Sequence, residues 1–336
     1  MQNLLDPAIL FFAFGVLAGA LKSNLEIPPA IAKFLSLYLL MALGLKGGFA
    51  LAKSGLSPEI AASLAAAMLM AVIVPALGYQ LLKRYVSKFD AAAVAASYGS
   101  VSAVTFVTAM QYLEANQMAF GGHMALAMVL MESPAIIMAV LLANSLRYAQ
   151  NSDVPVSANG VATPAIAGRP GSGTRVGKIL HESLTDGAHL LLLGSIAVGY
   201  LSGESGRAMM QPFAGDLFKG LLAFFLLDMG LMVAKNFASV RGKSPVLIAY
   251  AALGPLVHAA IALAIAGLLR MPVADTALLM VLAASASYIV VPAVLRYAIP
   301  EANPSLYFGL SLGITFPLNI LFGIPLYTFV AKSVLS

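Results

Sequence analysis

Long apolar segments follow one another along almost the whole chain, and this pattern constrains the fold more than any single motif. Only 10% of the residues are charged, whereas a soluble domain carries about a quarter. A membrane span needs about 20 apolar residues, and we place ten such spans. They cover residues 7–21, 29–52, 58–82, 90–113, 123–146, 186–202, 212–234, 245–269, 274–299 and 304–331. We therefore predict an all-α polytopic membrane protein in a lipid bilayer.

One long polar segment divides the ten spans into two groups of five. It covers residues 147–185 and is rich in Ser, Gly, Pro, Asn and Ala, a composition typical of a flexible linker. The predicted organisation is a first five-helix repeat at 1–146, a cytoplasmic linker at 147–185 and a second five-helix repeat at 186–336.

Three landmarks recur at nearly equal spacing in the two halves, at offsets of 186, 188 and 183 residues. Regular offsets of this kind indicate duplication. Because five spans is an odd number, the second copy would start from the opposite side of the membrane, so we predict inverted repeats. The aligned landmarks are Leu43-Gly44-Leu45 with Met229-Gly230-Leu231, Ala95-Ala96-Ser97 with Ala283-Ala284-Ser285, and Pro134 with Pro317.

Lysine and arginine are distributed unequally between the two predicted sides. With the N-terminus outside, thirteen are cytoplasmic and six lie outside. Since such residues concentrate in cytoplasmic segments, we expect a multi-pass protein of the inner membrane with both termini outside and the linker in the cytoplasm. The six outer cations are Lys46, Lys53, Arg207, Lys219, Arg270 and Lys332.

Composition also excludes several function classes. The chain contains no cysteine, which excludes disulfides, thiolate nucleophiles and cysteine-ligated metals. His123, His181 and His189 lack the spacing of a metal site, and we expect His258 to be a hydrogen-bonded packing residue. The basic residues lie between apolar segments and do not cluster, which argues against nucleic-acid binding. No nucleophile is paired with a base, so we expect no enzyme activity and no resident cofactor.

Two small, hydroxyl-rich patches interrupt the fourth and ninth predicted spans. The first runs from Tyr98 to Thr105, and the second runs from Ser285 to Tyr288, shortly before Pro292. Glycine weakens a helix and proline breaks it, so both spans are expected to be discontinuous. The freed N–H groups and positive helix ends would then form a receptor for a small anion. The predicted substrate-binding residues are Gly99, Ser100, Val101, Ser102, Ala103, Thr105, Ser285, Ser287, Tyr288 and Ile289.

The same patches admit a simpler interpretation, in which small residues only allow helices to pack closely. Their matching positions in the two halves favour a transport site.

Two carboxylates lie inside apolar spans, where an unpaired charge costs several kcal/mol. Glu132 lies in the fifth span and Asp228 in the seventh. The predicted ion-coupling residues are therefore Ser102, Glu132, Ser287 and Asp228, with Na⁺ held at Ser102, Glu132 and Ser287. The alternative is that each carboxylate only pairs with a nearby polar group, such as Lys46 for Asp228.

The chain resembles the sodium-dependent bicarbonate transporters of the SbtA type over nearly its full length. The resemblance is carried by Ile27–Ile31, Gly44–Gly48 and Pro255–His258, and it is clearest at Ile299–Tyr307. It implies ten spans in inverted five-plus-five repeats and a core domain that moves against a gate domain. It also implies homotrimers and regulation by a PII-like protein on the cytoplasmic side.

The departures from the family pattern fall at the predicted site. Tyr288 stands where family members that carry bicarbonate have an aspartate, and Val290, Val291, Ala103 and Val104 replace small residues. A phenol should coordinate Na⁺ more weakly than a carboxylate.

The expected function is import of bicarbonate by sodium symport with alternating access. The alternatives are transport of another small carboxylate or inorganic anion, with proton coupling included, or a membrane sensor that does not transport.

Overall fold

The computed structural model describes residues 6–55, 57–152, 187–236, 244–288, 291–292, 295 and 298–335. Within these residues the regular structure is entirely helical, without a strand. Most of the predicted linker and the site candidate Ile289 lie outside the described residues.

The first half contains six helices, because the predicted fourth span is split into two. The helices are α1 (Pro7–Ala20), α2 (Pro29–Ser54), α3 (Pro58–Leu82), α4 (Lys88–Gly99), α5 (Ala103–Ala115) and α6 (His123–Ser152). Proline begins α1, α2 and α3, where its missing N–H needs no partner. Helix α6 continues through Pro134 to Ser152 and so extends beyond the predicted linker boundary at 146.

The second half is more irregular, with three π-helical segments. Its elements are α8 (Gly187–Met210), η2 (Gln211–Asp216), α9 (Leu217–Asn236), α10 (Pro245–Leu268), α11 (Val273–Ala284), α13 (Pro304–Leu310), η4 (Ser311–Thr315), α14 (Phe316–Leu318), η5 (Asn319–Gly323) and α15 (Ile324–Leu335). The predicted ninth span ends its first helix at Ala284 and continues as extended backbone.

Among the described residues, six helical stretches are long and apolar enough to cross a membrane, and the chain is therefore a multi-pass membrane protein. One of them, Leu190–Asn236, has 47 residues, about twice the length of a span. Gly203 interrupts it with non-helical angles of φ 55° and ψ −142°. Three shorter helices are also apolar, at Pro7–Ala20, His123–Glu132 and Val273–Ala284.

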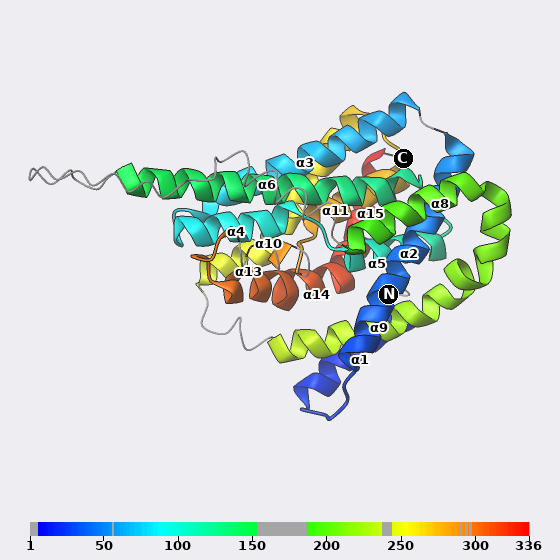
Figure 1. The fold of residues 1–336 in the computed structure, drawn as a ribbon, viewed down its shortest axis with the longest axis horizontal. Coiled ribbons are helices and arrows are strands. Elements are labelled where there is room, and N and C mark those ends of the chain that lie inside the picture. Colours follow the sequence, from blue (N-terminus) through cyan, green and yellow to red (C-terminus); the bar gives the residue numbers. More distant parts are fainter. Residues whose placement is uncertain are drawn as a thin grey trace, which may run out of the picture.

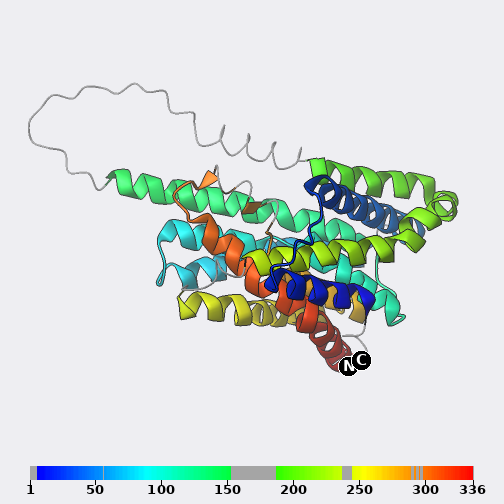
Figure 2. The ribbon, with the colours of Figure 1, turned by 90° about the horizontal axis from the view of Figure 1, so that it is seen from below.

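The helices form two groups. In one group α1 packs along α9 and α2 packs along α8, whereas in the other α3 packs on α4 and α6, and α10 packs on α11. Figure 1 shows the first group at the right and along the bottom, and the second group at the left and along the top. In Figure 2, α2 (blue) and α8 (green) lie at one end of the molecule, and α4 (cyan) and α10 (yellow) lie at the other.

Small residues bring the paired helices of the first group into backbone contact. A Cβ on Gly199 of α8 would lie 2.6 Å from the carbonyl oxygen of Leu45 in α2 and 3.1 Å from Cα of Gly48. Gly15 of α1 and Gly230 of α9 approach each other in the same way. Close contacts between small residues are a common means of joining helices in membranes, where apolar burial alone gives no preference for protein over lipid.

The helices beside the two breaks are the most deeply buried elements. Residues 91–99 of α4 and 274–284 of α11 are buried without exception. A helix that is buried on every side must have neighbours all around it, and the alanines of α4 let those neighbours approach closely. These two helices therefore form the interior of the second group.

Two aspartates attach the starts of these buried helices to loops of the other half. Asp90, at the third position of α4, accepts a hydrogen bond from the Asn303 amide at 2.7 Å. Asp275, at the third position of α11, accepts one from the Gly121 amide at 2.6 Å. We call these contacts the Asp90 and Asp275 clamps. Each carboxylate also lies in the first turn of its helix, where the helix dipole favours negative charge.

The α2–α8 contact generates a prediction. Gly199→Ala should destabilise the protein by about 1–3 kcal/mol, because the new methyl group overlaps the backbone of α2, which cannot rotate away. The measurement is the thermal unfolding midpoint of the purified protein in detergent.

Gly194→Ala is the matched control on the same helix, since a Cβ there meets nothing within 4 Å and alanine is the better helix former. Equal midpoints for the two variants would contradict the close contact.

Candidate functional site between the two helix breaks

The first break separates α4 from α5. Ser100 follows the last residue of α4 in an extended conformation, with φ −93° and ψ −178°. Ser102 then caps α5, because its Oγ accepts a hydrogen bond from the Thr105 amide at 3.2 Å. Gly99 allows α4 to end against α3, since a Cβ at this position would lie 2.5 Å from Cγ of Pro75. A capping serine and a glycine thus encode the break.

The second break follows α11 and is supported by the last span. Ser285 is extended, with φ −82° and ψ 168°, and its Oγ donates to the carbonyl oxygen of Leu282 at 2.8 Å. Nδ2 of Asn319 donates to the carbonyl oxygen of Ala284 at 2.8 Å, and the Tyr327 hydroxyl donates to Oδ1 of the same asparagine at 3.0 Å. The final carbonyl of α11, which has no partner within the helix, is therefore satisfied.

The two breaks bind each other through their freed backbone groups. The Ser102 amide donates to Oγ of Ser285 at 3.0 Å, and the Ser287 amide donates to the carbonyl oxygen of Ser97 at 2.7 Å. Oγ of Ser287 in turn accepts from the Val291 amide at 3.3 Å. The end of α4, the start of α5 and the end of α11, which come from both halves of the chain, consequently converge in the buried interior.

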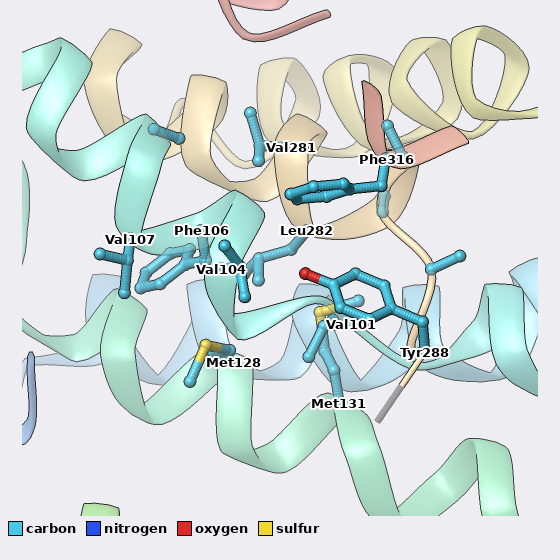
Figure 3. Close-up of a cluster of buried hydrophobic side chains, with 14 of the residues drawn as sticks. Val101, Val104, Phe106, Val107, Met128, Met131, Val281, Leu282, Tyr288 and Phe316 are labelled. Carbon is cyan, nitrogen blue, oxygen red and sulfur yellow. The ribbon is translucent and has the colours of Figure 1, made fainter. Parts of the chain in front are cut away.

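Tyr288 extends from the second break toward the first. Its hydroxyl accepts a hydrogen bond from Oγ of Ser102 at 3.3 Å, and its ring meets that of Phe316 edge-on at 5.1 Å. Figure 3 shows the ring within a cluster of buried hydrophobic side chains that includes Val101 and Met131. The phenol therefore places one oxygen at the break and surrounds that oxygen with apolar groups.

Two hydroxyls beside the first break have no hydrogen-bond partner among the residues that the structure describes. They are Oγ of Ser97 and Oγ of Ser100, whose side chains are 0% and 1% exposed. Leaving a buried hydroxyl unsatisfied costs about 1–3 kcal/mol, so a bound ligand that supplies the missing partners would be stabilised here.

The electrostatics of the first break favour an anion. The first amides of α5, at Ala103 and Val104, have no carbonyl partner within the helix, and the positive end of the helix dipole lies at the same point. The same hydroxyls and carbonyls are hard oxygen ligands of the kind that bind a cation such as Na⁺. Among the described residues no group of three or more His, Asp and Glu side chains could hold a metal.

The structure brings most of the predicted site residues together in the interior. Gly99, Ser100, Val101, Ser102, Thr105, Ser285, Ser287 and Tyr288 are buried, and Ala103 is half-buried. Glu132 lies on α6, next to Met131 of the cluster in Figure 3, and is half-buried. Asp228 is half-buried on α9, which belongs to the other helix group.

The suggested pairing of Lys46 with Asp228 is wrong. Nζ of Lys46 lies 3.0 Å from Oε1 of Glu114, at the end of α5, and 4.3 Å from the centre of the Phe218 ring. The sequence analysis did not single out Glu114, because Glu114 lies at the end of a span, where a carboxylate can be exposed to water and is not unusual.

Several residues that support the site were not among the predicted site residues. Asn319 and Tyr327 support the second break from the last span. The Tyr98 hydroxyl shares a 2.6 Å hydrogen bond with Oγ1 of Thr315, which itself donates to the carbonyl oxygen of Ala251. Each is a single polar residue in an apolar span, and only its contact with a distant part of the chain gives it a role.

The stretch Ile299–Tyr307 joins the second half to the first. Glu301 accepts two hydrogen bonds from Arg147 of α6, both at 2.7 Å, and Asn303 both caps α13 and donates to the Asp90 clamp. A two-point guanidinium–carboxylate pair is geometrically specific. This stretch therefore orients the loop before the last span.

Comparison with known proteins identifies the family of the chain. No curated protein matches the sequence. A protein family does match, over residues 7–332, and it is described as the Na+-dependent bicarbonate transporter superfamily. The match covers nearly the whole chain, including both helix breaks and the two Asp clamps. The chain therefore belongs to the Na+-dependent bicarbonate transporter superfamily.

Proposed function

We propose that the protein is a secondary active transporter that imports bicarbonate together with Na⁺ by alternating access. The observation that carries the proposal is the pair of helix breaks whose freed groups meet inside the protein. A small planar oxyanion can accept hydrogen bonds from the α5 amides and from the unpartnered hydroxyls of Ser97 and Ser100. Discontinuous helices of this kind commonly form transport sites.

The proposed Na⁺ site is next to the anion site and is built from oxygen ligands. Ser102 and Ser287 supply hydroxyls at the two breaks, and Tyr288 supplies a phenol that is hydrogen-bonded to Ser102. Glu132 of α6 is the proposed source of negative charge, because Na⁺ bound by neutral oxygens alone would be poorly compensated.

Inverted repeats are part of the proposal, and matching helix contacts support them. Gly15 contacts Gly230 where α1 meets α9, and Gly199 contacts Gly48 where α8 meets α2. Gly15 thereby corresponds to Gly199 at an offset of 184 residues, and Gly48 corresponds to Gly230 at an offset of 182. These contacts make Gly48 the equivalent of Gly230 in the first repeat. Gly48 lies one helical turn beyond Gly44, which the sequence alignment had paired with Gly230.

The clamps and the breaks repeat at similar offsets. Asp90 corresponds to Asp275 at an offset of 185 residues. Each carboxylate accepts a hydrogen bond from a backbone amide in the loop before the last span of the other half. Ser285 ends α11 as Ser100 ends α4, again at an offset of 185. Such agreement supports duplicated five-span units and ten membrane crossings.

The remaining features of the proposal concern location and assembly. The thirteen-to-six distribution of lysine and arginine supports both termini outside, the linker in the cytoplasm and insertion in the inner membrane. A homotrimer and a PII-like cytoplasmic regulator rest on family resemblance alone.

Uptake of isotope-labelled bicarbonate into proteoliposomes tests the function. An inward Na⁺ gradient should drive accumulation, and Ser102→Ala should reduce the initial rate by about tenfold, because it removes the α5 cap and a ligand hydroxyl.

Ser63→Ala is the control, since Ser63 is also buried but bonds only to the Glu59 carbonyl within α3. Specific binding of bicarbonate without flux under any gradient would contradict the carrier and favour a sensor, whereas uptake of other anions alone would correct the substrate.

Tyr288→Phe tests the phenol. The variant keeps the ring contact with Phe316 but removes the hydroxyl that bonds Ser102, so the Na⁺ concentration for half-maximal uptake should rise by about three- to tenfold with the fold unchanged. The measurement is bicarbonate uptake against Na⁺ concentration. An unchanged Na⁺ dependence would exclude the phenol oxygen from the ion site.

Glu132→Gln distinguishes the two coupling ions. If Na⁺ is coupled through this carboxylate, the variant should lose Na⁺-driven accumulation while exchange of bicarbonate down its own gradient continues. If a proton gradient replaces Na⁺ in the wild type, the same variant should abolish proton-driven accumulation. Concentrative uptake that survives in the variant under both gradients would refute a coupling role for Glu132.

A further inference from the structure

A large cavity with a cationic wall lies between the two helix groups, apart from the helix breaks. Its volume is about 1070 Å³, and α2, α5 and the helical segment from the end of α8 to the start of α9 form most of its wall. The charged side chains that line it are four cations, Lys46, Lys53, Arg207 and Lys219, and two carboxylates, Glu114 and Asp216. We call this space the cationic vestibule.

These four cations are most of the cations on the predicted outer side of the protein. The predicted outer side carries only six lysines and arginines, and four of them line the vestibule. Membrane insertion explains why cations are scarce on an outer side, but it does not explain why the few that are present converge on one cavity from three different helices. Their convergence points to a role in the cavity itself.

Two of the four cations are free to act on a ligand. Lys46 is paired with Glu114, and Arg207 lies 3.6 Å from Glu204. In the described part of the chain, neither Lys53 nor Lys219 forms an ion pair or a side-chain hydrogen bond. The lining side chains therefore carry four positive and two negative charges, and the excess of positive charge includes two lysines that are not ion-paired.

The vestibule leads toward the first break through α5. Phe106 and Met110 of this helix line the vestibule, and Phe106 also belongs to the hydrophobic cluster around Tyr288 (Figure 3). Ser102, the cap of α5, lies one turn before Phe106. One helix therefore presents its positive end to the anion site and its side to the vestibule, with Phe106 between them.

We infer that the cationic vestibule collects small oxyanions at the outer entrance and so supplies the site between the breaks. This inference rests on the proposed function for the identity of the anion. A cavity of this size is far larger than bicarbonate, so the lysines act through their field and not by enclosing the ion. Clefts lined by one sign of charge raise local ion concentration and association rates by about 10- to 1,000-fold, and salt screens the effect.

The electrostatic part can be tested without transport, because the natural chain has no cysteine. Ala119→Cys places one thiol on the exposed vestibule wall, and Ser333→Cys places one on exposed α15 as the control. For each variant, the measurement is the rate of reaction with an anionic methanethiosulfonate divided by the rate with a cationic one. At low ionic strength this ratio should be about tenfold higher for Ala119→Cys than for Ser333→Cys. Lys53→Gln with Lys219→Gln, or high salt, should remove this preference, and equal ratios at both positions would overturn the inference.

Transport provides the second readout. At low ionic strength, Lys53→Gln with Lys219→Gln should raise the bicarbonate concentration for half-maximal uptake by about three- to tenfold and leave the maximal rate unchanged. Lys332→Gln, a neutralised cation outside the vestibule, should change neither value. An unchanged half-maximal concentration would refute the collecting role. If the wild type does not transport, the proposed function fails, while the thiol ratios still decide whether the vestibule attracts anions.

Discussion

Two hydrogen bonds between the interrupted helices hold the two halves of the chain together, and the interior is arranged around them. In each, a backbone amide freed by one break finds its acceptor at the other, from Ser102 to Ser285 and from Ser287 to Ser97. Within a bilayer such groups have no water to bond with, so a partner in the protein is obligatory. Because neither break satisfies itself, neither half can form its interior alone. This requirement explains why α4 and α11, the helices that lead into the breaks, are buried along nearly their whole length.

The clamps hold the starts of α4 and α11, and the breaks lie at their other ends. Asp90 and Asp275 attach the helix starts to loops of the opposite half, so the start of each helix is secured where it enters. The breaks then leave the far ends extended, with Ser97 and Ser100 still unpartnered. Rigid anchoring at one end and unsatisfied groups at the other make a preorganised site, in which a ligand completes hydrogen bonds without first having to order the chain.

Local sequence chemistry was sufficient to predict the membrane class and both helix breaks. The breaks could be predicted because a capping serine, a glycine and a proline act on their own neighbours. The contacts that support the breaks could not be predicted, since Asp90 and Asn303 lie 213 residues apart and Gly121 and Asp275 lie 154 apart, and no pattern along the chain relates them. The incorrect Lys46–Asp228 pairing has the same cause, because opposite charge alone does not indicate proximity. The roles of the site residues, the inverted repeats and the trimer stay predictions.

Tyr288 and the cationic vestibule bear on the same part of the proposal, which is how a site with little fixed negative charge would hold Na⁺ beside an anion. A phenol buried among Val101, Met131 and Phe316 lowers the local polarity, and electrostatic attraction strengthens as polarity falls. A bound bicarbonate would then be the nearest negative charge available to Na⁺, and each ion would depend on the other for its affinity. The lysines of the vestibule would favour the anion at the entrance and repel free Na⁺. Under the proposed function, the anion would therefore enter first and create the attraction that Na⁺ requires.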